Sequence, residues 1–281
     1  PVRLQTASDL KCVPLFVGVI SPKFTQSAVT VTGGLWRSVR VDTHSTSRTS
    51  HSSHSIDLMA AATAAPTPER VTPVKSQHDD QEYRCITLGN GMQCVLVSDP
   101  TADKAGVSVD VGVGKFQDPP EIPGLAHFCE HMLFLGTKKY PVENSYSSFL
   151  GAHGGRSNAS TGYEHTNYYL DVLPEHLEEA VDRVSQFFKY PLFTPSATDR
   201  EVNAVHNEHL KNKIKDARKI GQVIRSLANA NHPIVRFGSG NKETIETIPK
   251  AKGVDVRAHL LRFYRTYYHP KAIKLVTNNA L

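Results

Sequence analysis

Two histidines and one glutamate lie close together in residues 127–131 (HFCEH), inside an otherwise apolar run from 124 to 136. On a helix, residues three and four apart share a face, so His127, Glu130 and His131 project together. Burying two imidazoles and a carboxylate among apolar neighbours costs free energy unless a partner satisfies them. A bound metal ion is such a partner, and we interpret this segment as a candidate catalytic site.

Two histidines one helical turn apart can both ligate Zn²⁺, at about 2.0–2.1 Å. A catalytic zinc site also needs a third protein ligand and an open position for water. Glu130 would lie beside that water and act as the general base, because zinc lowers the pKa of bound water to about 7. The order His-x-x-Glu-His is the inverzincin pattern and predicts amide hydrolysis. The alternative interpretation is a buried helix that carries an incidental polar pair.

A second acidic pair offers the missing ligand. Glu201 and Glu208 are seven residues apart in a segment that is expected to be helical, so they share one face two turns apart. This spacing fits Glu208 as the third ligand and Glu201 as the acid that orients a ligating histidine. Taken alone, both residues are more typical of ordinary surface carboxylates.

The surrounding elements predict an α+β fold with a largely antiparallel sheet packed against helices, because strands and helices mix without strict βαβ alternation. An Asn-Gly turn at 89–91 predicts a hairpin. Alternating valines at 107–113 predict a half-buried strand. The remaining expected elements are strands at 166–173 and 272–277, and helices at 124–136, 144–150, from Pro174, at 194–225 and at 254–267.

The first 80 residues differ in composition from the rest. Residues 43–55 are almost entirely Ser, Thr and His, and residues 60–75 are rich in Ala, Pro and Thr. Such segments bury too little apolar surface to offset their ordering entropy. We therefore expect 1–80 to be a disordered or non-native extension, with Met59 as an alternative start, and 82–281 to be the catalytic domain.

Composition excludes several classes of protein. The chain is 39% hydrophobic and 21% charged, and its net charge of +5 forms no basic stripe with interleaved aromatics, so we expect no nucleic-acid partner. No apolar run reaches about 18 residues, which argues against a membrane span. Four cysteines favour a reducing compartment. We expect a cytoplasmic location, or a mitochondrial one if the extension is genuine.

The densest basic stretch, at 211–219, is expected to be a solvated helix face rather than an anion site.

Four stretches resemble the M16 family of zinc metallopeptidases, and within it the insulysin branch. They are 119–140 (PPEIPGLAHFCEHMLFLGTKKY), 153–172 (HGGRSNASTGYEHTNYYLDV), 192–208 (LFTPSATDREVNAVHNE) and 237–247 (FGSGNKETIET). The family motif is His-x-x-Glu-His followed by Glu after 76 intervening residues, as in this chain. The resemblance covers residues 82–281 and implies an M16 metallopeptidase-like (LuxS/MPP-like) domain.

By position, the resemblance implies zinc as cofactor, with His127, His131 and Glu208 as ligands. It likewise implies Glu130 as the general base and Glu201 as the supporting acid. It further implies that Ser157, Asn158 and Ala159 lie on an exposed edge strand against which the peptide substrate adds as another strand.

Enzymes of this branch have four related domains around a closed chamber. We therefore expect a domain that is truncated at its C-terminal end, hydrolyses short or unfolded peptides, and has the missing C-terminal domains as partners. Two alternatives remain: a catalytically incompetent zinc-binding fragment that acts as a binding or regulatory partner, and a subunit like those of mitochondrial processing peptidase. A homo-oligomer is left open.

Overall fold

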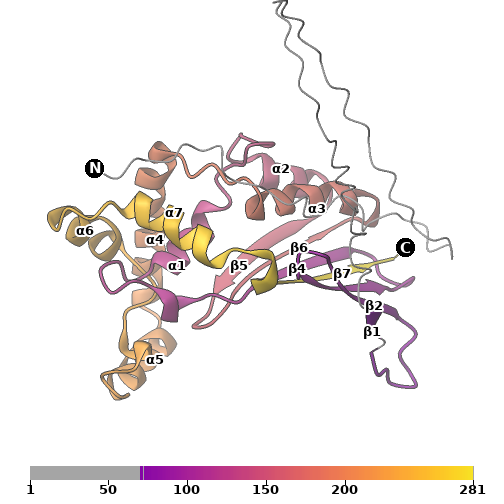
Figure 1. Ribbon diagram of the computed structural model, residues 1–281, viewed down its shortest axis with the longest axis horizontal. Helices are drawn as coiled ribbons and strands as arrows, with labels where there is room; N and C mark the ends of the chain where they lie inside the picture. The colour runs from indigo at the N-terminus through magenta and orange to yellow at the C-terminus, as the bar shows by residue number, and fades with distance from the viewer. Residues whose placement is uncertain (1–69, 72, 281) are drawn as a thin grey trace, which may run out of the picture.

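The computed structural model describes residues 70, 71 and 73–280, which form one mixed sheet with helices packed against it (Figure 1). The strand order is β1-β2-β3-β7-β4-β6-β5. Among the strands of the described residues, β3 and β7 are the one parallel pair, so the structure confirms the α+β class with a largely antiparallel sheet. The strands are β1 (Arg70–Val71), β2 (Glu82–Thr87), β3 (Gln93–Ser98), β4 (Ala105–Val111), β5 (Arg156–Thr161), β6 (Thr166–Val172) and β7 (Ile273–Asn279).

The two strand patterns seen in the sequence form as expected. Between β2 and β3 the turn closes through the amide of Gly91, which donates to the carbonyl of Leu88 at 2.8 Å, and Gly91 has a φ of 87°. In β4, Val107, Val109 and Val111 are buried while the residues between them are half-buried. Period-two burial of this kind places one face of the strand in the core.

The helices pack on and beside the sheet. Figure 1 shows α2 and α3 lying along the sheet, whereas α1, α4 and α7 pack together at one end of it. The helices are α1 (Leu125–Met132), α2 (Ser145–Ala152), α3 (Leu177–Ser185), α4 (Pro195–Lys213), α5 (Asp216–Ser226), α6 (Ile248–Ala251) and α7 (Val256–Tyr267). Short 3₁₀ or π turns cover 115–117, 174–176, 186–188, 233–235, 243–247 and 270–272. None of the helices in this part of the chain is long and apolar enough to cross a membrane.

The expected single helix over 194–225 is wrong, because the chain breaks between α4 and α5. Lys215 is extended, with φ −81° and ψ 122°, and Asp216 then opens α5 with an acidic group in its first turn. A negative charge at that position favours a new helix N-terminus. Every residue of α5 is at least partly exposed, so no buried contact holds it in line with α4.

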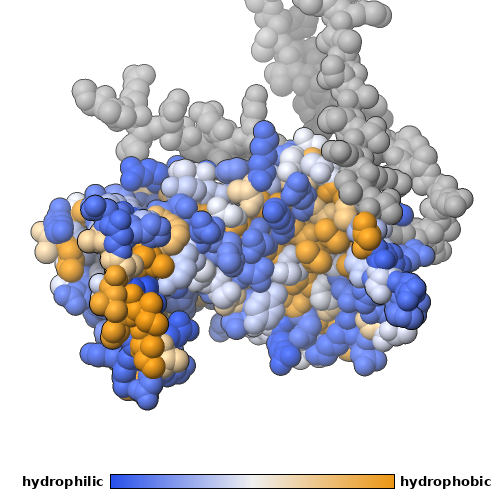
Figure 2. Space-filling model, turned by 90° about the horizontal axis from the view of Figure 1, so that it is seen from below, coloured by the Kyte–Doolittle hydropathy of each residue, from blue (hydrophilic) through white to orange (hydrophobic). Residues whose placement is uncertain are grey.

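Helix α5 carries an exposed apolar stripe. Ile220, Val223 and Ile224, together with Leu227 directly after the helix, are between 59% and 81% exposed. Figure 2 shows the resulting orange patch at the end of the molecule where α5 projects from the body. No residue of α5 is buried, so its apolar residues do not form the buried face that a surface helix usually has.

The sheet begins before the expected domain boundary. Strand β1 pairs antiparallel with β2, with Arg70 opposite Ile86 and Val71 opposite Cys85. Strand β1 lies within residues 1–80, which were expected to be disordered or non-native, and its partner β2 lies within the expected catalytic domain. The rest of that expectation for residues 1–69 and 72, including Met59, lies outside the described residues.

A close backbone contact fixes where α1 begins. Gly124 precedes α1 with a φ of 98°, and a Cβ at this position would lie 2.3 Å from the Cα of Gly240. The side chain of Asp118 accepts hydrogen bonds from the amides of Gly124 and Ala126, each at 2.7 Å, and so caps the helix. Burial raises the pKa of Asp118 to about 7, against the opposing effect of these two bonds.

Gly124→Ala is expected to destabilise the fold by about 2–4 kcal/mol, because a side chain there meets both a left-handed φ and the backbone of Gly240. The matched control is Gly151→Ala in α2, where a Cβ would have nothing within 4 Å. That change is expected to be neutral or to stabilise by about 0.5–1 kcal/mol. Urea unfolding of both variants measures the difference, and equal stability would show that the Gly124 contact is not required.

Candidate metal centre

Helices α1 and α4 cross so that three side chains meet. One ligand atom from each of His127, His131 and Glu208 lies within 4.8 Å of the other two. Oε2 of Glu208 is 3.4 Å from Nε2 of His127 and 3.3 Å from Nε2 of His131. The structure thus brings together the histidine pair and the carboxylate that the sequence analysis singled out.

The other nitrogen of each ring is already occupied. Nδ1 of His127 is 2.6 Å from the backbone carbonyl oxygen of Ser239, and Nδ1 of His131 is 2.8 Å from Oε1 of Glu201. Because a carbonyl and a carboxylate oxygen can only accept, both Nδ1 atoms carry a hydrogen and donate it. In the neutral rings, the lone pairs therefore lie on the Nε2 atoms, which face Glu208. Glu201 is thus in place to orient His131.

This geometry suits a cation. Two nitrogen lone pairs and a carboxylate oxygen that face one another repel unless a proton or a metal ion lies among them. Their separations of 3.3 and 3.4 Å match the roughly 3.4 Å between two ligands at about 2.1 Å from a tetrahedral zinc. The Glu208 side chain is 42% exposed, so the centre also has an open side for water.

The pKa shifts of the side chains in the cluster also indicate a site that favours positive charge. Burial of the His131 ring opposes protonation, but the hydrogen bonds to Glu201 and Glu208 outweigh it and raise the pKa of His131 to about 9. The hydrogen bonds from His127 and His131 hold the pKa of Glu208 well below its usual range. In both cases, positive charge at the meeting point is what the surrounding groups stabilise.

Glu130 lies buried beside this point, with 7% of its surface exposed. The hydroxyl of Thr161 donates a hydrogen bond to Oε2 of Glu130. Thr161 is the last residue of β5, so the carboxylate lies between α1 and this strand. Such a position allows Glu130 to exchange a proton with a molecule bound at the histidine–glutamate cluster.

Strand β5 lies at the edge of the sheet. Among the described strands it pairs only with β6, in a register that sets Ser157 opposite Leu170 and Ala159 opposite Tyr168. The strand holding Ser157, Asn158 and Ala159 therefore has one side free for another strand. Its end at Thr161 lies next to Glu130, so an added strand would pass the centre.

Three supporting residues were missed by the sequence analysis. Ser239 contributes only a backbone carbonyl, which no residue type signals. Thr161 is an ordinary strand residue until the fold sets it against Glu130. Asp118 lies six residues before Gly124, too far from the helix for the usual capping signal, which stands directly before the first helical residue.

Comparisons with known proteins agree with this geometry. The family model "Insulinase (Peptidase family M16)" matches residues 93–231. Insulin-degrading enzyme from Homo sapiens is 56% identical over 194 residues, which cover 69% of this chain and 19% of that protein. The A-factor-processing enzyme of Saccharomyces cerevisiae is 48% identical over 202 residues, covering 72% of this chain and 20% of that protein.

A solved structure supports the same assignment. The crystal structure of pitrilysin matches with a TM-score of 0.73 and 37% sequence identity over 76% of this chain and 23% of that one. The chain spans about a fifth of the length of the curated relatives it matches. The matched family model, these identities and the shared fold together show that the chain belongs to peptidase family M16, the insulinase family.

Proposed function

We propose that this chain is the catalytic domain of a zinc-dependent endopeptidase that hydrolyses short or unfolded peptides. The observation that carries the proposal is the convergence of two Nε2 atoms on Glu208 at 3.3 and 3.4 Å, with both Nδ1 atoms already bonded elsewhere. A cluster held in this way is suited to binding a divalent cation rather than to packing in an uncharged core. The relatives reported above give no support to the two alternative functions.

His127, His131 and Glu208 would hold zinc. When bound, zinc polarises a peptide carbonyl and lowers the pKa of an attacking water. Glu130 takes a proton from that water while the oxygen of the water bonds to the carbonyl carbon of the peptide. The same carboxylic acid then gives the proton to the leaving nitrogen as the C–N bond breaks, which leaves Glu130 as it began.

Two further residues keep these groups in position. The Thr161 hydroxyl holds one oxygen of Glu130, which leaves the other free for the water. Glu201 fixes the ring of His131 with its Nε2 atom turned toward Glu208. Both are positioning residues because they act through a neighbouring group.

The substrate is proposed to lie along β5. Main-chain hydrogen bonds to the free side of Ser157, Asn158 and Ala159 would hold a peptide in extended form. Such pairing requires an unfolded segment and reads little of its sequence, which suits the proposed substrate class. The partner prediction of further C-terminal domains rests on the much greater length of the relatives.

Glu130→Gln is expected to lower the rate of peptide cleavage by about 10²–10⁴-fold while zinc content stays unchanged, because only proton transfer is lost. Glu208→Gln is expected to lose both activity and zinc. A quenched fluorescent peptide and metal analysis of the same preparations measure the two effects. Removal of metal by a chelator should abolish cleavage, and re-addition of zinc should restore it. Wild-type rates in Glu130→Gln would contradict the proposed role.

Zinc affinity is expected to rise with pH. Below a pKa of about 9, a proton on His131 competes with the metal, so the apparent dissociation constant should fall about tenfold per pH unit from about pH 7 toward 9. Isothermal titration calorimetry in buffers of different ionisation enthalpy measures the released proton. In Glu201→Gln the pKa of His131 falls, so the affinity should level off at a lower pH. An affinity independent of pH in the wild-type protein would contradict this assignment.

A further inference from the structure

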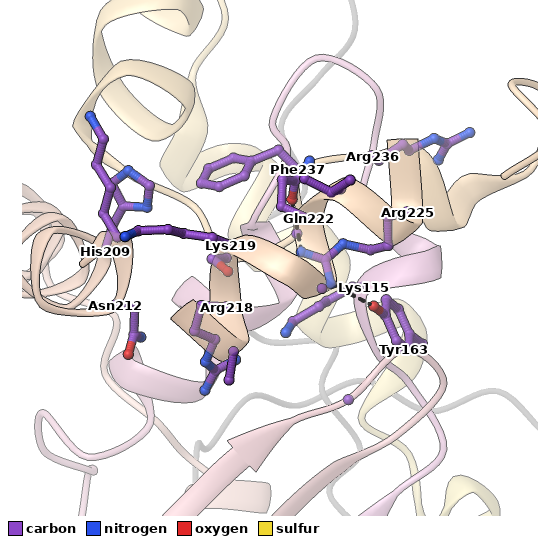
Figure 3. A pocket seen from close by; sticks show the side chains of 17 residues that line it. Lys115, Tyr163, His209, Asn212, Arg218, Lys219, Gln222, Arg225, Arg236 and Phe237 are labelled. Carbon is purple, nitrogen blue, oxygen red and sulfur yellow. Dashed lines mark hydrogen bonds between the residues drawn. The ribbon is translucent and has the colours of Figure 1, made fainter. Parts of the chain in front are cut away.

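A strongly basic cavity of about 720 Å³ lies beside the metal centre (Figure 3). It is bounded by α5, the end of α4, the β5–β6 turn and the segment 236–239. The described residues that line it include no carboxylate but include six cationic side chains, which are Lys115, Lys213, Arg218, Lys219, Arg225 and Arg236. A concave site with charge of one sign concentrates ligands of the opposite sign.

The break between α4 and α5 creates this cavity. Because the chain turns at Lys215, Arg218 and Arg225 of α5 line the same cavity as Lys115, and Arg218 is exposed to solvent there. Figure 3 shows the side chains of Lys115, Arg225 and Tyr163 close together, with Arg218 nearby. The basic stretch at 211–219 was expected to be a solvated helix face. In the structure, some basic residues of this stretch also line a cavity.

Most of this charge has no carboxylate partner among the described residues. Lys219 forms an ion pair with Asp216 at 2.9 Å, but none is found for the other five. Arg225 instead donates to the hydroxyl of Tyr163 at 3.3 Å, and Arg236 donates to the backbone carbonyl of Asp118 at 3.3 Å. Burial and the nearby charge of Arg218 lower the pKa of Lys115, and they outweigh the opposite effect of the Asp118 and Glu130 carboxylates. The cavity thus gathers like charges that an anionic ligand would relieve.

The cavity adjoins the centre at two points. Ser239 lines it, and the carbonyl of the same residue holds His127. Gly162 and Tyr163 also line it, and they directly follow Thr161, which holds Glu130. A peptide laid along the free side of β5 and continued past its end would therefore reach the basic walls.

We propose that this cavity binds acidic side chains of the peptide substrate, so that the enzyme prefers peptides with Asp or Glu on one side of the cleaved bond. The placement of the peptide rests on the function proposed above. Neutral main-chain pairing on β5 then supplies general affinity, and the cavity supplies the selection by charge.

Binding can be tested without cleavage, using the zinc-loaded Glu130→Gln protein and two fluorescent peptides that differ only in Glu or Gln at a run of positions. The Glu peptide is expected to bind about tenfold tighter at low salt, and the preference should shrink at about 1 M salt. Arg218→Glu with Arg225→Glu should abolish the preference and favour a matched Lys peptide. The control pair, Lys252→Glu with Arg262→Glu, makes the same charge change at exposed positions outside the cavity and should keep it.

Equal binding of the Glu and Gln peptides, or an equal loss in the control pair, would overturn the proposal. So would tight binding of inorganic tripolyphosphate by a protein that shows no preference for the Glu peptide, since the cavity would then serve free anions. If the α5 variants fail to fold, the comparison of the two peptides in the parent protein still decides. A preserved Glu preference in a chain whose wild type cleaves no peptide would reject the proposed hydrolysis and leave the acidic-peptide site standing.

Discussion

The arrangement of this domain depends on one constraint: two imidazole nitrogens and one carboxylate oxygen must meet at one point. His127, His131 and Glu208 present electron pairs to a common point at separations of 3.3 and 3.4 Å. Such a cluster is unfavourable without a positive charge at its centre. The fold therefore has to keep these three groups close together despite their mutual repulsion. The elements around α1 and α4 keep them in position.

The hold is built from polar contacts at the ends of elements. The carbonyl of Ser239 and the carboxylate of Glu201 each fix one ring, so neither histidine can rotate freely. Asp118 caps α1, and the approach of Gly124 to Gly240 brings the Ser239 carbonyl to its place. Ligands, caps and close backbone contacts thus form one connected structure around the first turns of α1.

The basic side chains near the metal centre also depend on how elements distant in sequence are placed. Basic residues of helix α5 line the cavity beside the metal centre, and the apolar residues of this helix are exposed rather than buried. Surface helices ordinarily do the opposite, because exposing apolar side chains to water is unfavourable. The basic walls lie next to the end of the edge strand β5, so that shape and charge near the centre come from elements that are distant in sequence.

The sequence by itself determined the chemistry and the class of fold. Helical spacing placed His127, Glu130 and His131 on one face, turn and alternation patterns predicted most strands, and the spacing of Glu201 and Glu208 singled out the acidic pair. These features depend on local geometry, which is set by residues near one another in the chain.

Only the tertiary structure decided how distant groups meet. The contacts of the Ser239 carbonyl with His127 and of the Thr161 hydroxyl with Glu130 depend on packing between segments, and a backbone carbonyl has no residue type to reveal it. The expectation of one continuous helix failed for the same reason, because no core contact holds α5 in line with α4. Local spacing therefore predicted which residues could bind a metal, whereas long-range packing decided what orients them and what lies beside them.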